Sequence, residues 1–275
     1  MPEARSYPEV IHKAMHYSLM AGGKRLRPSL VIAAAEAVGG DRQSVMPFAV
    51  ATELIHTYTL IHDDLPALDN DDLRRGKPTN HKVFGEAIAI LAGDALLTQA
   101  FLLMTHSALM PSIPAECLLM ASHEMAVAMG SGGVIGGQVV DLESEGKPVG
   151  PETLEYIHIY KTGFLFRACV RSGALLSQAS KSHLAALTQF GAHIGLAFQI
   201  IDDILDIVGD EKVLGKDIGS DLSKDKATYP GLYGLGASRE KAEDLVEKGI
   251  GCLESFDDRA DPLREIARFF VQRTH

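Results

Sequence analysis

The segment FQIIDDILD, residues 198–206, places three aspartates in an otherwise apolar stretch. The spacing i, i+3, i+4 and i+7 puts four polar side chains on one stripe of an α-helix: Gln199, Asp202, Asp203 and Asp206. Unpaired carboxylates on a helix flanked by apolar residues are costly, so the stripe requires metal ions or basic side chains opposite it. A structural salt-bridge network stays open as the alternative. In either case the chain has to fold so that further charged groups face this helix.

Apolar residues elsewhere recur mostly three and four positions apart, as in Val50, Leu54, Tyr58 and Ile61, and strict alternation is rare. This pattern predicts an all-α fold. Turns rich in Gly, Pro or both separate the helical segments near residues 39–40, 66, 76–78, 111–114, 146–151 and 209–219. None is long enough to link two domains and no fixed repeat is found, so we expect a single domain over residues 1–275.

A second acidic cluster, HDDLPALDNDD at residues 62–72, holds five aspartates within ten positions. On an ideal helix Asp63 and Asp69 would lie about 240° apart. Pro66 disfavours helical geometry at the residue before it, so the two carboxylates can reach one ion only if the chain leaves α geometry there. A solvated acidic turn is the alternative interpretation.

The two acidic clusters predict Mg2+ and a phosphorylated substrate. Carboxylate oxygens suit hard cations, and Mg2+ binds through one or two carboxylates while keeping water and substrate phosphates as its other ligands. Two basic segments, GGKRLRP (22–28) and LRRGK (73–77), supply groups that hold phosphate. Either basic segment alone would be interpreted as a solvated face.

Several other function classes are excluded. The chain has 26 Lys and Arg against 36 Asp and Glu, a net charge of −10, which disfavours a nucleic-acid partner. GGKR lacks the P-loop pattern, and GSGGVIGG (130–137) does not satisfy the dinucleotide-binding pattern, so we expect these glycines to serve close helix packing. HEMAV, from His123, is not a zinc-peptidase H-E-x-x-H sequence.

Location and membrane association are judged from composition. The N-terminal segment lacks a signal-peptide pattern, and three distant cysteines form no disulfide framework, which indicates the cytoplasm. The least charged stretch, Ala95 to Met110, has only sixteen residues and several polar side chains. We therefore expect a buried helix there and no transmembrane segment.

The ordered motifs resemble those of the trans-isoprenyl diphosphate synthases. The resemblance rests on GGKRLRP, ELIHTYTLIHDD, DDLPALD followed by NDDLRRGKPTNHK, GGQVVDL, YKTG, FQIIDDILD, GKDIGSD and KATYP, and so covers most of the chain. It implies the isoprenoid synthase fold, with long helices around a central active-site cavity, in a homodimer. It also implies an Mg2+-dependent prenyltransferase that joins isopentenyl diphosphate to an allylic diphosphate.

The resemblance also assigns roles to individual residues. Metal binding falls to Asp63, Asp64, Asp69, Asp202 and Asp206. The allylic diphosphate would be held by Arg74, Lys161 and Lys216, and the diphosphate of isopentenyl diphosphate by Lys24, Arg27, His56 and Arg75. Lys161, Thr162 and Gln199 form the catalytic group, in which Thr162 and Gln199 direct oxygen dipoles toward the reacting allylic carbon. Lys226 and Asp141 support the site.

The product is expected from the floor of the cavity. On a helix Tyr58 and Thr59 lie about 7.5 Å and about 6 Å along the axis before Asp63. An aromatic ring at Tyr58, together with four residues between Asp64 and Asp69, resembles farnesyl diphosphate synthases. Geranylgeranyl diphosphate is the alternative product, since Tyr58 can also be a plain core residue. A noncatalytic synthase subunit and a terpene cyclase are less favoured, because both aspartate motifs and a second diphosphate site are present.

Overall fold

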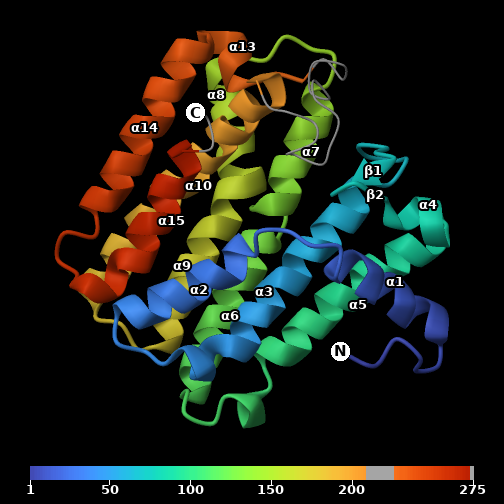
Figure 1. Ribbon diagram of the computed structural model, residues 1–275, viewed down its shortest axis with the longest axis horizontal. Helices are drawn as coiled ribbons and strands as arrows, with labels where there is room; N and C mark the ends of the chain where they lie inside the picture. The colour runs from blue at the N-terminus through green and yellow to red at the C-terminus, as the bar shows by residue number, and fades with distance from the viewer. Residues whose placement is uncertain (209–225, 273–275) are drawn as a thin grey trace.

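The computed structural model describes residues 1–208 and 226–272. Helices make up nearly all of its regular structure, which confirms the expected all-α fold (Figure 1). The α-helices are α1 (Glu9–Leu19), α2 (Leu26–Ala37), α3 (Arg42–Asp63), α4 (Asn80–Phe84), α5 (Glu86–Met104), α6 (Ala115–Met129), α7 (Val134–Ser144), α8 (Pro151–Ile157), α9 (Phe164–Leu176), α10 (Lys181–Val208), α13 (Tyr229–Tyr233), α14 (Leu235–Gly251) and α15 (Asp261–Gln272). Short helices of other types are η1 (Ser107–Leu109), the π-helix η2 (His158–Gly163) and η3 (Asp258–Ala260). The only strands in the described ranges are β1 (Leu73–Arg74) and β2 (Lys77–Pro78), an antiparallel pair.

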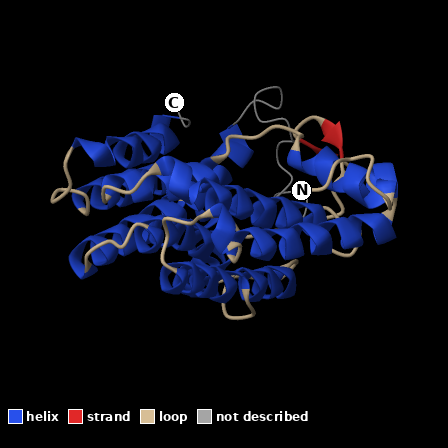
Figure 2. Ribbon diagram, turned by 90° about the horizontal axis from the view of Figure 1, so that it is seen from below, coloured by secondary structure: helices blue, strands red, loops and turns tan. Residues whose placement is uncertain are grey.

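The long helices lie side by side in a bundle, seen from two directions in Figures 1 and 2. Helix α3 packs against α2 and α5, α9 packs against α2, α6 and α10, and α10 packs against α14. Phenylalanines from four helices are fully buried and anchor the core: Phe48, Phe166, Phe190 and Phe270. Burying a side chain of this size stabilises a fold by about 1.5–3 kcal/mol. The bundle thereby holds α3 and α10, which carry the two acidic clusters.

Helix α3 has defined start and end points. Its N-cap Asp41 accepts a hydrogen bond from the backbone N–H of Ser44 at 2.8 Å, which satisfies one of the free donors of the first turn. The helix ends at Asp63, three residues before Pro66. Asp63 is therefore the last residue of α3, and Asp64 directly follows it as the C-cap.

Glycines permit two close contacts between elements beside the acidic helices. A Cβ at Gly137 on α7 would collide with the backbone of Lys161 on η2, and a Cβ at Gly195 on α10 would lie 2.8 Å from the Cα of Gly163. The expectation that glycines of the 130–137 segment serve close packing is confirmed at Gly137. This approach brings α7, η2 and α10 together around one cleft.

The expectation for Ala95 to Met110 is wrong in its boundaries. Helix α5 begins at Glu86 and ends at Met104, because Thr105 donates its hydroxyl to Phe101 and the chain then turns into η1. The helix is also not fully buried, since Leu102 is 57% exposed. By length and composition α5, residues 115–144 and α10 could each cross a membrane. The length argument against a membrane span therefore does not hold, although residues 115–144 are interrupted between α6 and α7.

Candidate active site

The chain turns back on itself immediately after α3. The backbone N–H of Asp69 donates to the carbonyl of Asp63 at 2.8 Å, and Asn70, with φ at 52°, donates to the carbonyl of Leu65 at 3.1 Å. The departure from α geometry that the sequence required near Pro66 is therefore present. Burial raises the pKa of Asp63, and the neighbouring Asp69 carboxylate adds to the rise while Lys161 opposes it. The two residues are therefore joined through the backbone, and their carboxylates lie within electrostatic range of each other.

Asp64 is paired with an arginine from the β-hairpin. Arg74 Nε donates to Asp64 Oδ1 at 2.6 Å, and the Asp64 side chain is only 4% exposed. Burial outweighs this attraction and raises the pKa of Asp64 to about 7. The hairpin turn has positive φ at Arg75 and Gly76, as a two-residue turn of type I′ requires. Asp64 is therefore already paired with the guanidinium of Arg74 in this structure.

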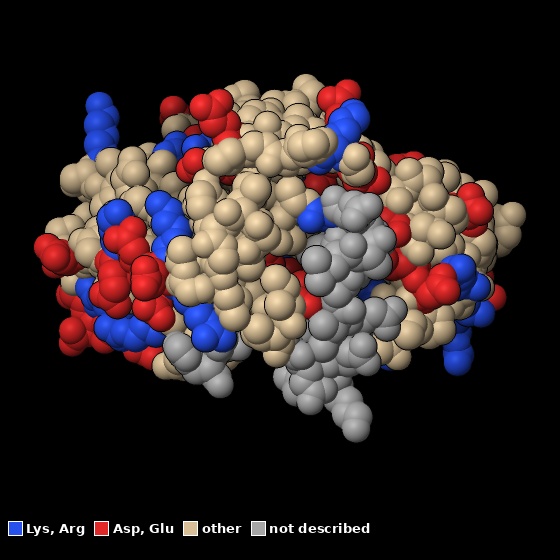
Figure 3. Space-filling view, turned by 90° about the horizontal axis from the view of Figure 1, so that it is seen from above, with Lys and Arg blue, Asp and Glu red and all other residues tan. Residues whose placement is uncertain are grey.

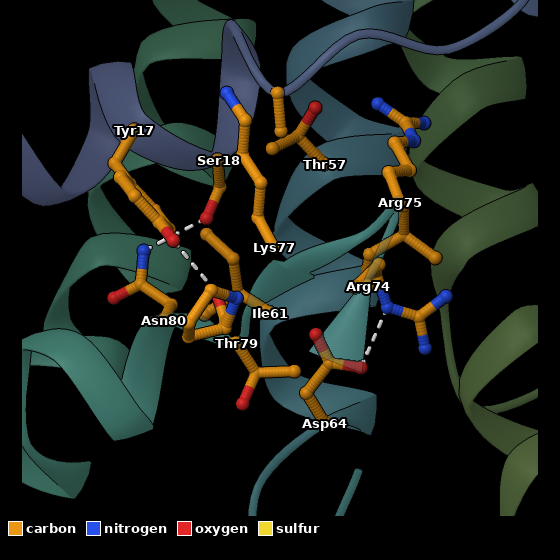
Figure 4. Close-up of a pocket in the computed structure, with 13 residues that line it drawn as sticks. Tyr17, Ser18, Thr57, Ile61, Asp64, Arg74, Arg75, Lys77, Thr79 and Asn80 are labelled. Carbon is orange, nitrogen blue, oxygen red and sulfur yellow. Dashed lines mark hydrogen bonds and ion pairs between the residues drawn. The ribbon is translucent and has the colours of Figure 1, made fainter. Parts of the chain in front are cut away.

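The hairpin also lines a pocket beside α1 and α3 (Figure 4). Arg74 turns toward Asp64, whereas the guanidinium of Arg75 points away from it and donates to the carbonyl of Gly22. On the far side Tyr17 donates to the carbonyl of Pro78 at 2.8 Å. The two adjacent arginines therefore bind different partners: Arg74 binds the Asp64 carboxylate and Arg75 binds the carbonyl of Gly22.

Arg27, His56 and Arg75 form a second basic group, as the resemblance implied. Burial lowers the pKa of His56 well below 6.5, and the charges of Arg27, Arg75, Arg74 and Arg25 lower it further. Arg27 lies over the ring of Phe166 at 5.2 Å. Within the part of the chain that the structure describes, Arg27 Nε and His56 Nδ1 are buried without a hydrogen-bond partner. Buried donors gathered around excess positive charge suit an anion.

The neighbours of this basic group were not predicted from the sequence. Arg25 Nη1 donates to Glu53 Oε1 at 2.5 Å, and Glu53 is almost fully buried. Their spacing of 28 residues gives no local pattern to read. Lys24, which the resemblance assigned to the same diphosphate, directly precedes Arg25 and is exposed.

A chain of ion pairs connects the first acidic cluster to α7 and η2. Lys226 Nζ lies 2.8 Å from Asp69 Oδ1 and 3.6 Å from Asp141 Oδ2. Lys161 Nζ lies 2.6 Å from the same Asp141 oxygen. Lys226 and Asp141, to which the resemblance gave a supporting role, thus link the acidic turn after α3 to the π-helix η2 through ion pairs.

The catalytic group predicted from the sequence is assembled between η2 and α10. Thr162 Oγ1 donates to Gln199 Oε1 at 2.7 Å, and Gln199 Nε2 donates to Asp203 Oδ1 at 3.0 Å. These side chains line a cleft together with Lys161 and Asp141. The π-helix matters here, because single-turn π segments re-aim side chains and are frequent at functional sites.

The remaining acids of the α10 stripe are Asp202 and Asp206. Asp206 is 1% exposed, and Asp202 is half-buried. Burial lowers the pKa of Arg27, and the Asp202 carboxylate opposes that shift, which places Asp202 within electrostatic range of the basic group. Figure 3, which views the molecule from above the orientation of Figure 1, shows acidic and basic side chains close together near the middle of the face that is seen.

Tyr58 and Thr59 lie on α3 one turn before the acidic cluster. Tyr58 is buried, and its ring packs edge-on against His62 with centroids 5.7 Å apart. Burial raises the pKa of Tyr58 to about 12, with a further contribution from Asp63. Thr59 donates its hydroxyl to the carbonyl of His56 at 2.9 Å. Tyr58 is thus a buried residue of α3 near Asp63, and its role in chain length stays a prediction.

The carboxylates fit a divalent cation in their chemistry. Asp63 and Asp69 supply hard oxygen ligands whose mutual repulsion a cation would relieve. Among residues 1–208 and 226–272, no three His, Cys, Asp or Glu side chains are gathered closely enough to hold an ion by themselves. Mg2+ commonly needs only one or two carboxylates when substrate phosphates complete its shell. Lys216 lies outside the described residues.

Comparison with known proteins adds to this geometry. A family model described as Polyprenyl synthetase matches residues 8–261. The farnesyl diphosphate synthase of Geobacillus stearothermophilus is 49% identical over 268 residues, which cover 98% of this chain and 90% of that protein. The geranylgeranyl diphosphate synthase of Cyanophora paradoxa is 48% identical over 272 residues, with coverage of 98% and 90%. The structure of an FPP/GFPP synthase from Zymomonas mobilis has a TM-score of 0.87 and 39% identity, and the match covers 98% of this chain and 91% of that one.

Proposed function

The chain belongs to the polyprenyl synthetase family and is a prenyltransferase, and we propose that it condenses isopentenyl diphosphate with dimethylallyl or geranyl diphosphate. The observation that carries this substrate assignment is that two acidic clusters and two basic groups lie within electrostatic range of one another: Asp63 is affected by Lys161 and Arg74, and Arg27 by Asp202. One basic group contains Arg74 and Lys161, and the other contains Arg27, His56 and Arg75. Two separate anion sites suit a reaction between two diphosphates.

Asp63, Asp64 and Asp69 on one side, with Asp202 and Asp206 on the other, hold Mg2+ in this proposal. Bound Mg2+ neutralises the diphosphate leaving group. Arg74 and Lys161 place fixed positive charge on the same diphosphate, which stabilises the charge that develops as the carbon–oxygen bond breaks. Loss of one such preorganised donor typically costs about 2.7–4 kcal/mol of barrier. Lys216 belongs to this set by resemblance.

Thr162 and Gln199 act on the other product of that ionisation. Their oxygens present the negative ends of bond dipoles to the allylic carbon, which becomes cationic when diphosphate leaves. Lys24, Arg27, His56 and Arg75 hold isopentenyl diphosphate so that its double bond meets this carbon. Holding both reactants in one orientation supplies much of the rate enhancement of a two-substrate reaction.

Farnesyl diphosphate is the proposed product, with geranylgeranyl diphosphate as the alternative. The buried ring of Tyr58 beside Asp63 supports the shorter product, because a ring there limits the space for a growing chain. Similar proteins include synthases named for either product. Tyr58→Ala should therefore lengthen the product, and Tyr233→Ala, at an exposed tyrosine of α13, should leave it unchanged. An unchanged product from Tyr58→Ala would remove this residue from chain-length control.

The first experiment is a product analysis of the purified chain. The chain is incubated with Mg2+, isopentenyl diphosphate and either dimethylallyl or geranyl diphosphate, and the chain length of the dephosphorylated product is measured. A fifteen-carbon product is expected. A product formed without isopentenyl diphosphate would indicate a cyclase, and no product at all would indicate a noncatalytic subunit.

The enzyme acts as a homodimer in the cytoplasm under this proposal. Support for the dimer comes from large apolar side chains exposed on three consecutive helices, α5, α6 and α7. These side chains are Ile90, Leu91, Leu102, Leu119, Met120, Val127, Ile135 and Val139. Exposed apolar side chains gathered in this way are typical of protein interfaces.

A further inference from the structure

Asp203 on α10 is a buried acid whose two carboxylate oxygens are both bound by other parts of the protein. Asp203 is 3% exposed and accepts two hydrogen bonds. Gln199 Nε2 donates to Oδ1 at 3.0 Å, while the backbone N–H of Tyr229 donates to Oδ2 at 2.9 Å. His158 Nε2 lies 3.2 Å from Oδ2, within ion-pair distance. Because the protein contacts both carboxylate oxygens, a metal ion at Asp203 would have to compete with these contacts.

These contacts decide which way the Gln199 amide faces. A glutamine amide has a donor end and an acceptor end of nearly equal size. Because a carboxylate only accepts hydrogen bonds, Asp203 binds the NH2 end of Gln199. The Oε1 end is left toward Thr162, whose hydroxyl donates to it at 2.7 Å, and toward the cleft. The carbonyl dipole of Gln199 is thereby fixed in one direction.

His158 holds Asp203 in turn. It lies on the π-helix, is 3% exposed, and its ring stacks on that of Tyr229 with centroids 5.9 Å apart. Asp203 therefore joins three elements: α10, η2 with Lys161 and Thr162, and the segment that runs from Lys226 to Tyr229. A shift of any of them would turn the Gln199 amide.

We propose that Asp203, held by His158, is a positioning residue that keeps the carbonyl oxygen of Gln199 directed at the reacting allylic carbon. This inference rests on the proposed prenyl transfer. It separates the role of Asp203 from the metal binding proposed for Asp202 and Asp206. Misplacing a catalytic group by about 1 Å can cost about 10²-fold in rate.

The kinetic test compares Asp203→Asn, His158→Leu, His158→Gln and Asp202→Asn with the wild type. Asp203→Asn and His158→Leu should lower kcat by about tenfold to 10²-fold. KM for both diphosphates and the Mg2+ concentration at half-maximal rate should stay within about twofold, since no ligand contact is lost. His158→Gln keeps a donor near the Nε2 position and should recover most of the loss. Asp202→Asn should instead raise the Mg2+ requirement.

A second test needs no activity. In protein labelled with 15N-glutamine and free of Mg2+ and substrates, the side-chain NH2 of Gln199 should exchange slowly with solvent in the wild type and His158→Gln. It should exchange at least about tenfold faster in Asp203→Asn, whose new amide competes as a donor. Fast exchange in the wild type would overturn the inference even if a variant fails to fold.

The kinetic outcomes separate this inference from the proposed function. A wild-type chain that makes no prenyl product refutes the proposed function, while the exchange experiment still reports on the Gln199 amide. An active wild type with a raised Mg2+ requirement in Asp203→Asn would make Asp203 a metal ligand and refute the positioning role. Unchanged kcat in His158→Leu, or equal losses in both His158 variants, would refute it as well.

Discussion

Replacing Asp63 or Asp202 by alanine should remove most turnover without unfolding the protein. Each variant loses a carboxylate proposed to hold Mg2+ on the leaving diphosphate, so we expect a loss of at least about 10²-fold in kcat. Burial already disfavours the ionised form of Asp63, so its removal sacrifices little stability. Steady-state kinetics and thermal unfolding check both statements. Asp244→Ala, at a partly exposed acid of α14 paired with Lys248, is the matched control. Near-normal rates in either site variant would refute the metal assignment.

His56 should make the stability of the protein depend on pH below neutrality. Burial and the surrounding arginines lower the pKa of His56 well below 6.5 in the folded state. The unfolded chain therefore takes up a proton near pH 6.5 that the folded chain does not, and the free energy of unfolding falls as the pH drops below that value. His56→Gln should have a shallower slope between pH 6.5 and 5, by at most about 1.4 kcal/mol per pH unit. Urea unfolding at several pH values measures this. Equal slopes in the two proteins would contradict the prediction.

At the scale of elements, Gly137→Ala should disturb the contact between α7 and η2. The new Cβ collides with the backbone of Lys161, which cannot move without shifting the π-helix. Overpacking of this kind costs about 1–3 kcal/mol in the free energy of unfolding, and kcat should fall with it. Gly236→Ala on α14 is the control, because a Cβ there meets nothing within 4 Å. That variant should be neutral or up to about 1 kcal/mol more stable. If Gly137→Ala and Gly236→Ala have similar free energies of unfolding, the close contact between α7 and η2 does not contribute to stability as predicted.

The elements also show where sequence reasoning succeeds and where it stops. Local patterns sufficed for the all-α fold, for the stripe on α10 and for the turn after Asp63, because spacing and Pro66 act within a few residues, but they did not give the bounds of α5. The β-hairpin was not predicted, since its strands have two residues each and its turn needs positive φ at Arg75 as well as Gly76. Two neighbours of Asp203 were missed for a different reason: Tyr229 is 26 residues away, and His158 lies on another helix. Such contacts depend on tertiary packing.

The whole molecule should behave as a dimer of twice the 29.6 kDa chain mass. Leu119 on α6 is 70% exposed, and a charge there should disfavour a buried apolar interface. Leu119→Glu is expected to shift the protein toward monomer in size-exclusion chromatography with light scattering. Met20→Glu, at a residue 69% exposed beyond α1, should leave the dimer intact. A monomeric wild type would refute the dimer.

The charges around the cleft are already paired in the ligand-free protein. Arg74 holds Asp64, Lys226 holds Asp69 and Lys161 holds Asp141. If a divalent cation bound alone, these carboxylates would leave their basic partners behind, and a diphosphate alone would strand the carboxylates in the same way. When both bind together, every group exchanges one partner for another and no buried charge is abandoned. On the proposed function, binding of the cation should therefore strengthen binding of the diphosphate, and the diphosphate should strengthen binding of the cation by the same factor.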